Sequence, residues 1–176
     1  MDDRCRDPGG WRIESSLLSL PGYRRLLDAS ATVEAFDPYR YDQLLVGQLT
    51  KGYRQLVDEA EAEVETLSVE EAHRVLADGS RLIVDIRDVR ELSREGKIPG
   101  AFHAPRGMLE FWVDPESPYH HAALSEADEL LLYCGSGWRS ALAASTLQGM
   151  GMTNVAHIGG GFSGWVEAGY EVEKKE

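Results

Sequence analysis

Short apolar runs in the second half of the chain predict the strands of a buried sheet. They cover residues 82–86, 130–133 and 155–158 and are rich in Leu, Ile and Val. Runs of this length without polar alternation are typical of strands that are covered on both faces. Between them, apolar positions recur at intervals of three and four, which indicates helices. Because strands and helices alternate, we expect an α/β fold with a parallel sheet flanked by helices on both faces.

The predicted helices of this half have recognisable ends. Ser68 and Glu71 form a capping box ahead of a helical apolar face, and Gly79 supplies a stop. A polar helical segment is expected over residues 88–95. Residues 140–150 carry small apolar side chains that suit a tightly packed helix.

The first third of the chain is helical in pattern and lacks the strand-like runs. Pro21 and Pro38 interrupt it, and one helical stripe is formed by Leu45, Leu49, Tyr53, Leu56 and Ala60. We predict a helical N-terminal extension over residues 1–65, followed by a domain over residues 66–176. The extension packs on this domain, forms a homodimer or binds a protein partner, and the sequence leaves these three alternatives open.

Composition and charge restrict what the chain binds. A chain of 176 residues with 43% hydrophobic residues can bury one core of ordinary domain size. Its net charge of −12, negative in both halves, opposes binding to a nucleic-acid backbone. No apolar run approaches the roughly 20 residues that span a bilayer, and residues 1–10 do not resemble a signal peptide. We therefore expect neither nucleic acid nor a membrane as a partner.

Cysteine and histidine usage argues against disulfides and metal sites. Cys5 and Cys134 are the only cysteines, so we expect a cytoplasmic protein in which both stay thiols. The histidines show no zinc-like spacing with either cysteine. His120 and His121 are predicted to lie in an exposed loop, and His157 is predicted to be a hydrogen-bonded core residue.

Candidate chemistry lies directly after the second apolar run. Cys134 is followed by Gly135, Ser136, Gly137, Trp138, Arg139 and Ser140, so the chain turns from strand to helix within six residues. Two glycines allow successive amides to turn toward one centre, and the helix start adds partial positive charge. In parallel sheets, ligands bind beyond the carboxyl ends of the strands. The pattern predicts an exposed, reactive cysteine in an anion-binding loop.

This arrangement suits a thiolate nucleophile. An ordinary thiol has a pKa of about 8.5, and comparable surroundings lower it to somewhere between about 3.5 and 7.5. Arg139 adds a permanent positive charge and planar donors. The alternative is that Cys134 is a small buried hydrophobe, which is common for cysteine. A merely buried cysteine, however, has no need of two glycines, an arginine and a helix start after it.

Other loops that bind phosphate fit less well. Gly135-x-Gly137-x-x-Ser140 lacks the third glycine of a dinucleotide fingerprint, and no Gly-Lys-Ser or Gly-Lys-Thr occurs. Cysteine phosphatase loops place five residues between cysteine and arginine, whereas four separate Cys134 from Arg139. We interpret the shorter ring as matched to the single sulfur of a persulfide.

Four motifs follow one another in a fixed order. They are Val84-Asp85-Ile86-Arg87 with Glu91, Lys97-Ile98-Pro99-Gly100-Ala101, Cys134-x-x-Gly137-x-Arg139-Ser140, and Gly160-Gly161-Phe162-Ser163-Gly164-Trp165 through Gly169-Tyr170. They resemble the single-domain rhodanese family, with Lys97 in place of the usual histidine. The resemblance covers the predicted second domain and implies an α/β fold around a parallel sheet.

The resemblance implies a sulfurtransferase that works without a metal or organic cofactor. Cys134 would take sulfur as a persulfide from a small sulfur-containing anion such as thiosulfate, or from a persulfide donor, and pass it to a thiol or cyanide. Asp85 and Ser140 would orient the site. The substrate-binding residues would be Gly135, Ser136, Gly137, Trp138, Arg139 and Arg87.

Several assignments stay open at this point. An ion pair between Arg87 and Glu91 is as well supported as a substrate contact. Arg106, Trp112 and Trp138 would line the entrance or, for the tryptophans, pack in the core. A non-catalytic rhodanese-like protein-binding module is one alternative function. A cysteine phosphatase or arsenate reductase is another.

Overall fold

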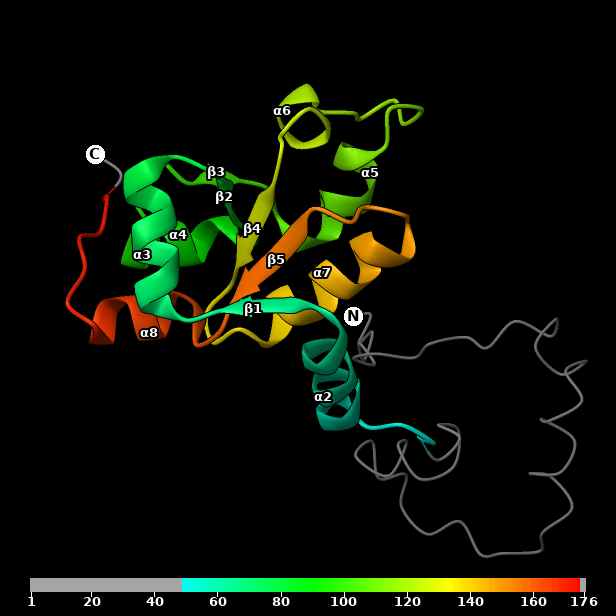
Figure 1. Cartoon of the computed structure of the whole chain (residues 1–176), viewed down its shortest axis with the longest axis horizontal. Coiled ribbons are helices and arrows are strands. Elements are labelled where there is room, and N and C mark those ends of the chain that lie inside the picture. The colour runs from blue at the N-terminus through cyan, green and yellow to red at the C-terminus, as the bar shows by residue number, and fades with distance from the viewer. Residues whose placement is uncertain (1–48, 175–176) are drawn as a thin grey trace, which may run out of the picture. The chain divides into compact units, whose positions relative to one another are not determined.

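The computed structural model describes residues 49–174, in which five strands form one parallel sheet (Figure 1). The strands are β1 (Glu65–Leu67), β2 (Leu82–Asp85), β3 (Phe102–His103), β4 (Leu130–Tyr133) and β5 (Val155–Ile158). Their order across the sheet is β1-β5-β4-β2-β3, and every pairing is parallel. The predicted parallel sheet is confirmed, and the three apolar runs are its three central strands. The sequence pattern missed the edge strands β1 and β3, which are too short to show a pattern.

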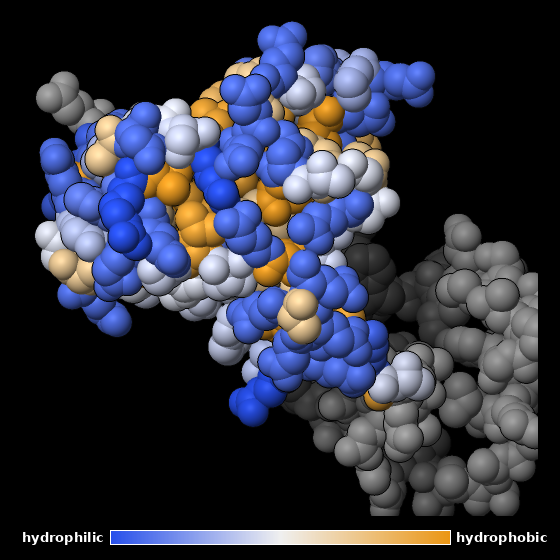
Figure 2. All heavy atoms as spheres, viewed as in Figure 1, coloured by the Kyte–Doolittle hydropathy of each residue, from blue (hydrophilic) through white to orange (hydrophobic). Residues whose placement is uncertain are grey.

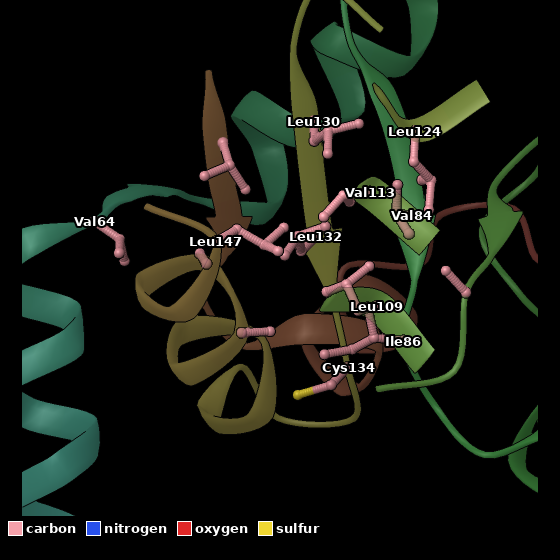
Figure 3. Close-up of a cluster of buried hydrophobic side chains, with 14 residues drawn as sticks. Val64, Val84, Ile86, Leu109, Val113, Leu124, Leu130, Leu132, Cys134 and Leu147 are labelled. Atoms are coloured by element: carbon pink, nitrogen blue, oxygen red, sulfur yellow. The ribbon is translucent and has the colours of Figure 1, made fainter. Parts of the chain in front are cut away.

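Helices cover both faces of this sheet. They are α2 (Tyr53–Glu63), α3 (Val69–Asp78), α4 (Val89–Glu95), α5 (Leu109–Val113), α6 (Ala122–Ser125), α7 (Trp138–Gly149) and α8 (Gly161–Glu167), with a 3-10 turn, η3 (Arg106–Met108), before α5. Leu130 and Leu132 of β4 pack with α5, α6 and α7 (Figure 3), whereas Leu131 and Tyr133 pack with α3 and α8. Successive side chains of a strand point to opposite faces, so one short strand supports two cores.

The predicted helix ends are present. Ser68 accepts a hydrogen bond from the amide of Glu71, whose carboxylate accepts one from the amide of Ser68, and Gly79 ends α3 in the left-handed conformation. Asp88 and Glu91 form a second capping box at α4. The helix expected over 140–150 begins two residues earlier, at Trp138, directly after the left-handed Gly137.

Helix α2 packs against α7. Val57 and Ala60 are buried in this contact, while Tyr53 and Leu56 of the predicted stripe are about half exposed. The side of α2 that faces the viewer in Figure 2 is mostly hydrophilic. Leu45, Pro21 and Pro38 lie outside the described residues, and the predicted division of the chain at residue 65 stays a prediction. No helix of the part described, residues 49–174, is both long and apolar enough to cross a bilayer.

Candidate active site

Cys134 lies at the carboxyl end of the central strand β4, where the chain turns into α7 (Figure 3). Gly137, with φ of 96°, is the N-cap of α7 and makes this abrupt turn possible. The expectation of an exposed sulfur is wrong: Cys134 is only 1% exposed. Side chains of Ser136, Trp138 and Arg139 in the same loop are exposed. The loop therefore encloses the cysteine and turns its other side chains outward.

The start of α8 holds this loop in place. The amide of Phe162 donates to the carbonyl of Cys134 at 2.8 Å, and the amide of Ser163 donates to that of Gly135 at 2.9 Å. Gly161 lies so close that a Cβ on it would stand 2.5 Å from the Cys134 oxygen. Gly161 was not predicted as a site residue, although the run of glycines over residues 159–161 is a signal that backbone approaches backbone there.

Gly161→Ala is expected to destabilise the protein and disturb the cysteine loop. Both a φ of +57° and the contacts with Cys134 and Gly135 oppose a side chain. Gly169→Ala is the matched control, because Gly169 has a φ of +75° and nothing within 4 Å of its Cβ position. The control should cost roughly 1–2 kcal/mol from strain alone, and Gly161→Ala should cost clearly more in urea unfolding. Equal losses of stability in the two variants would contradict the close contact of Gly161 with the cysteine loop.

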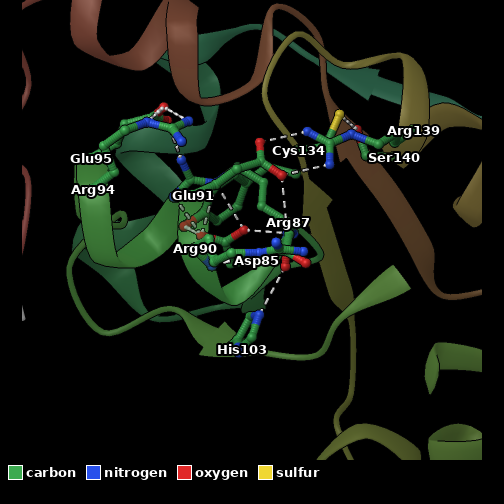
Figure 4. Close-up of polar contacts among 12 residues, drawn as sticks. Asp85, Arg87, Arg90, Glu91, Arg94, Glu95, His103, Cys134, Arg139 and Ser140 are labelled. Carbon is green, nitrogen blue, oxygen red and sulfur yellow. Dashed lines mark hydrogen bonds and ion pairs between the residues drawn. The ribbon is translucent and has the colours of Figure 1, made fainter. Parts of the chain in front are cut away.

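Arg139 faces Glu91 of α4 across the loop (Figure 4). Two parallel hydrogen bonds, both 2.8 Å long, join the guanidinium to the carboxylate. Those bonds, together with the nearby Cys134 sulfur, raise the pKa of Arg139 above its ordinary value. Hydrogen bonds from Arg139 and from the Asp88 amide lower the pKa of Glu91 to about 2. The predicted anion-binding arginine thus lies beside the sulfur with its charge already balanced.

This pair predicts a pH-dependent stability. The Glu91 carboxyl takes up its proton near pH 4.5 when unfolded but only near pH 2 when folded. The contribution of the ionised Glu91 to the free energy of unfolding is therefore fully present above about pH 4.5 and is lost as the pH falls toward 2. Glu91→Gln should be less stable than the parent at neutral pH, and the difference should shrink across this window in urea unfolding. Glu61→Gln, at an exposed position of α2, is the control, and a difference that did not change with pH would contradict the pairing.

Arg87 is held by carboxylates at the end of β2, and its role as a substrate ligand stays a prediction. Its side chain is 0% exposed and donates to Asp85, Glu95 and the Gly96 carbonyl (Figure 4). Its guanidinium also lies 3.9 Å from the centre of the Phe162 ring. The alternative, an ion pair of Arg87 with Glu91, is not formed, because Glu91 pairs with Arg139.

Asp85 organises the end of β2 rather than the sulfur itself. It is fully buried and accepts hydrogen bonds from Arg87 and, at 2.6 Å, from the Tyr133 hydroxyl. Burial and the nearby Asp85 raise the pKa of Tyr133, so this phenol stays a donor. Tyr133 also accepts from the amide of Ile98 at 3.1 Å. Because Tyr133 directly precedes Cys134, this network fixes the strand end from which the cysteine loop departs.

The remaining predicted residues divide between the site and the core. Ser140 is fully buried, and its hydroxyl lies 3.8 Å from the Cys134 sulfur. Trp138 is 50% exposed and lies beside Tyr53 of α2. Trp112 instead packs in the core against Phe102, and Arg106 pairs with Glu110.

The histidine predictions can be placed as well. His120 and His121 are exposed residues between α5 and α6, as predicted, and His121 stacks on Trp112. His157 is fully buried in β5, and both of its ring nitrogens have hydrogen-bond partners. The prediction of His157 as a hydrogen-bonded core residue is confirmed.

The fold and site together define an α/β protein with a buried thiol at the carboxyl edge of a parallel sheet. A family model described as a rhodanese-like domain matches residues 68–168. The chain therefore belongs to the rhodanese-like family. The predicted family and fold class are confirmed.

Curated relatives share this domain at modest identity. The mouse thiosulfate sulfurtransferase/rhodanese-like domain-containing protein 3 is 30% identical over 100 residues, which are 54% of this chain and 64% of the mouse protein. The Arabidopsis thaliana protein HIGH ARSENIC CONTENT 1, mitochondrial, is 31% identical over 118 residues, 64% of this chain and 68% of the plant protein. The match thus leaves about a third of each relative's length uncovered.

Solved structures add a closer and a more distant likeness. A Rhodopseudomonas palustris protein of unknown function, described as a possible tyrosine phosphatase, is 47% identical with a TM-score of 0.70, covering 73% of this chain and 99% of its own. The human single-domain sulfurtransferase TSTD1 is 30% identical with a TM-score of 0.50, covering 58% and 95%. The names of these two proteins point to different reactions, and the site chemistry has to discriminate between them.

Proposed function

We propose that this protein is a sulfurtransferase that carries sulfane sulfur on Cys134. The observation that carries the proposal is the placement of this thiol at the end of β4, with Arg139 beside it and the Ser140 hydroxyl 3.8 Å from its sulfur. A cation and a hydroxyl donor next to a thiol stabilise its ionised form. The family membership and the names of the mouse and human relatives support the same reaction.

The proposed reaction has two halves. The Cys134 thiolate attacks the outer sulfur of thiosulfate or of a persulfide donor. A new S–S bond forms while the donor's S–S bond breaks, and from thiosulfate sulfite leaves with the bonding electron pair. In the second half, a thiolate or cyanide attacks the outer sulfur of the Cys134 persulfide. This attack yields a new persulfide or thiocyanate and returns Cys134 as the thiolate, so no net redox change or cofactor is needed.

The residues of the loop have distinct places in this proposal. The amides of Gly135, Ser136, Gly137, Trp138 and Arg139 form the cradle for the outer sulfur. Since Cys134 is buried, the donor enters by displacing exposed loop side chains, of which Arg139 and Trp138 are the largest. Arg139 then exchanges part of its contact with Glu91 for the entering anion.

A phosphatase is the second candidate, because the Rhodopseudomonas palustris protein carries that description at 47% identity. Cysteine phosphatase loops place five residues between cysteine and arginine, whereas four separate Cys134 from Arg139. The shorter loop favours the single outer sulfur of a persulfide over a tetrahedral phosphoryl group.

Intact-mass measurement after incubation with thiosulfate tests the proposal. The parent protein should gain one sulfur mass, removable by cyanide, and peptide mapping should place it on Cys134. Cys5→Ser is the matched control, since it removes the other thiol of the chain and should keep the adduct. No adduct on either protein, with hydrolysis of an aryl phosphate instead, would overturn the sulfurtransferase in favour of the phosphatase.

Compartment and partners remain predictions of the sequence. The names of plant relatives assign one to mitochondria and another to chloroplasts, so the cytoplasmic location is not decided by family. We retain a homodimer or protein partner at the N-terminal helices as a proposal. Size-exclusion chromatography of the full chain tests whether the protein forms a homodimer.

A further inference from the structure

A chain of polar side chains leads to the cysteine from between the sheet and α7. Thr66 of β1 contacts His157 of β5 at 2.8 Å, His157 contacts Ser140 of α7 at 3.4 Å, and Ser140 contacts the Cys134 sulfur at 3.8 Å. His157 and Ser140 are both 0% exposed. The proposed sulfur transfer uses neither His157 nor Thr66, yet the contacts lead from them to the reacting atom.

The sheet brings these residues together. His157 is paired with Thr66 in β1 on one side and with Leu132 in β4 on the other. Leu132 packs on the α7 face, so a histidine beside it points toward α7, where Ser140 lies. The His157 ring can therefore contact the Ser140 hydroxyl from the sheet, while the same hydroxyl also lies near the Cys134 sulfur.

The hydrogen-bond roles follow from the donors available. The Ser140 hydroxyl has one proton, and its shortest contact, 2.9 Å, is to the Gly137 carbonyl, which can only accept. While Ser140 donates there, its contact with His157 requires Nδ1 to be the donor. Nε2 is then the acceptor for the Thr66 hydroxyl. Burial lowers the pKa of His157, which keeps the ring neutral with a single N–H.

We propose that His157 is a positioning residue that, through Nδ1–H, holds the Ser140 hydroxyl where it can donate to the Cys134 sulfur. When Cys134 becomes a thiolate, the Ser140 proton turns from Gly137 to the sulfur, and His157 keeps the hydroxyl oxygen in place. The assignment builds on the proposed function by giving a residue behind the loop a part in it. The thiolate is the leaving group of the second half-reaction, and a hydrogen bond to it favours its departure.

Two conservative variants separate positioning from packing. The amide of asparagine lies at the same number of bonds from Cα as Nδ1, whereas that of glutamine corresponds to Nε2. His157→Asn can therefore still donate to Ser140, and His157→Gln cannot in the same way. Both place an uncharged amide in the same buried position, so a purely structural role would treat them alike. Ser140→Ala removes the hydroxyl that donates to the Cys134 sulfur, so it shows how large the change is when that hydrogen bond is lost completely.

The test is the pH dependence of Cys134 alkylation by iodoacetamide in a Cys5→Ser background. Among residues 49–174, the charged groups at the cysteine loop are Arg139 and its partner Glu91, and they are unchanged in every variant. Ser140→Ala and His157→Gln should raise the apparent pKa of the thiol, and a pKa higher by one leaves roughly tenfold less thiolate at neutral pH. His157→Asn should stay close to the parent. Far-UV circular dichroism and urea unfolding identify variants that fail to fold.

The proposal would be overturned if His157→Gln and the parent showed the same pH dependence of alkylation. It would also be overturned if His157→Asn and His157→Gln changed the apparent pKa of the thiol equally. Thr66→Val supplies a second test, since losing its hydroxyl frees Nε2 to carry the ring proton. This variant should move the alkylation profile in the direction of His157→Gln and leave the fold intact. Alkylation needs no sulfur donor. Failure here is therefore distinguishable from failure of the proposed function, which the missing sulfur adduct would report.

Discussion

Cys134→Ser is expected to abolish thiosulfate-dependent production of thiocyanate, a loss on the order of 10³-fold or more. A serine hydroxyl is not ionised at neutral pH and cannot hold sulfur as a persulfide. Because the side chains are similar in size and the contact with the Ser140 hydroxyl can be kept by a serine, the fold should be kept. Colorimetric detection of thiocyanate over a range of cyanide concentrations measures the effect.

Two controls give this result its meaning. Cys5→Ser should keep full turnover, because the proposal assigns Cys5 no part. Unfolding of Cys134→Ser in urea should resemble that of the parent, within about 1 kcal/mol. Turnover by the serine variant comparable with that of the parent would show that sulfur does not pass through Cys134.

Arg87→Met is expected to cost about 3–5 kcal/mol of stability. Removing the guanidinium leaves Asp85 fully buried with the Tyr133 hydroxyl and a backbone amide as its remaining donors. An uncompensated buried charge is costly because the protein interior solvates it poorly. A loss of this size is a large part of the roughly 5–15 kcal/mol typical of a folded domain.

The exposed pair Arg90–Asp88 provides the matched control. It lies three positions further along the chain, with a similar distance of 2.9 Å but side chains that are 87% and 49% exposed. Arg90→Met should therefore change the free energy of unfolding by less than about 1 kcal/mol. Urea unfolding of the two variants compares the same chemical change in two environments. Equal losses would show that burial does not determine the importance of Arg87.

These stability effects also bear on the proposed sulfur transfer. The Asp85 network holds Tyr133, and the backbone passes directly from Tyr133 to Cys134. Arg87→Met should therefore lower sulfur transfer mainly by reducing the folded fraction and by loosening the end of β4. Arg139, in contrast, lies beside the sulfur and is partly exposed. The two arginines of the predicted substrate site thus have different surroundings, one buried among carboxylates and the other partly exposed beside the sulfur.

The sequence by itself determined the local features. The apolar runs predicted the three central strands, the Ser68 capping box and Gly79 marked the ends of α3, and the strand-loop-helix pattern placed Cys134 at the edge of the sheet. Each of these features depends on residues within a few positions of one another. Short-range hydrogen bonding and the periodicity of buried positions can therefore be recognised from the sequence alone. The family motifs indicated the reaction for the same reason, since they are local.

Only the tertiary structure decided which residues meet. Glu91 could pair with the nearby Arg87, but it pairs with Arg139, 48 positions away, because Asp85 and Glu95 already surround Arg87 in the core. Thr66 and His157 are 91 positions apart and become neighbours because β1 adds to the sheet beside β5. Strand order and side-chain burial set these contacts, and neither is a property of any short stretch of sequence.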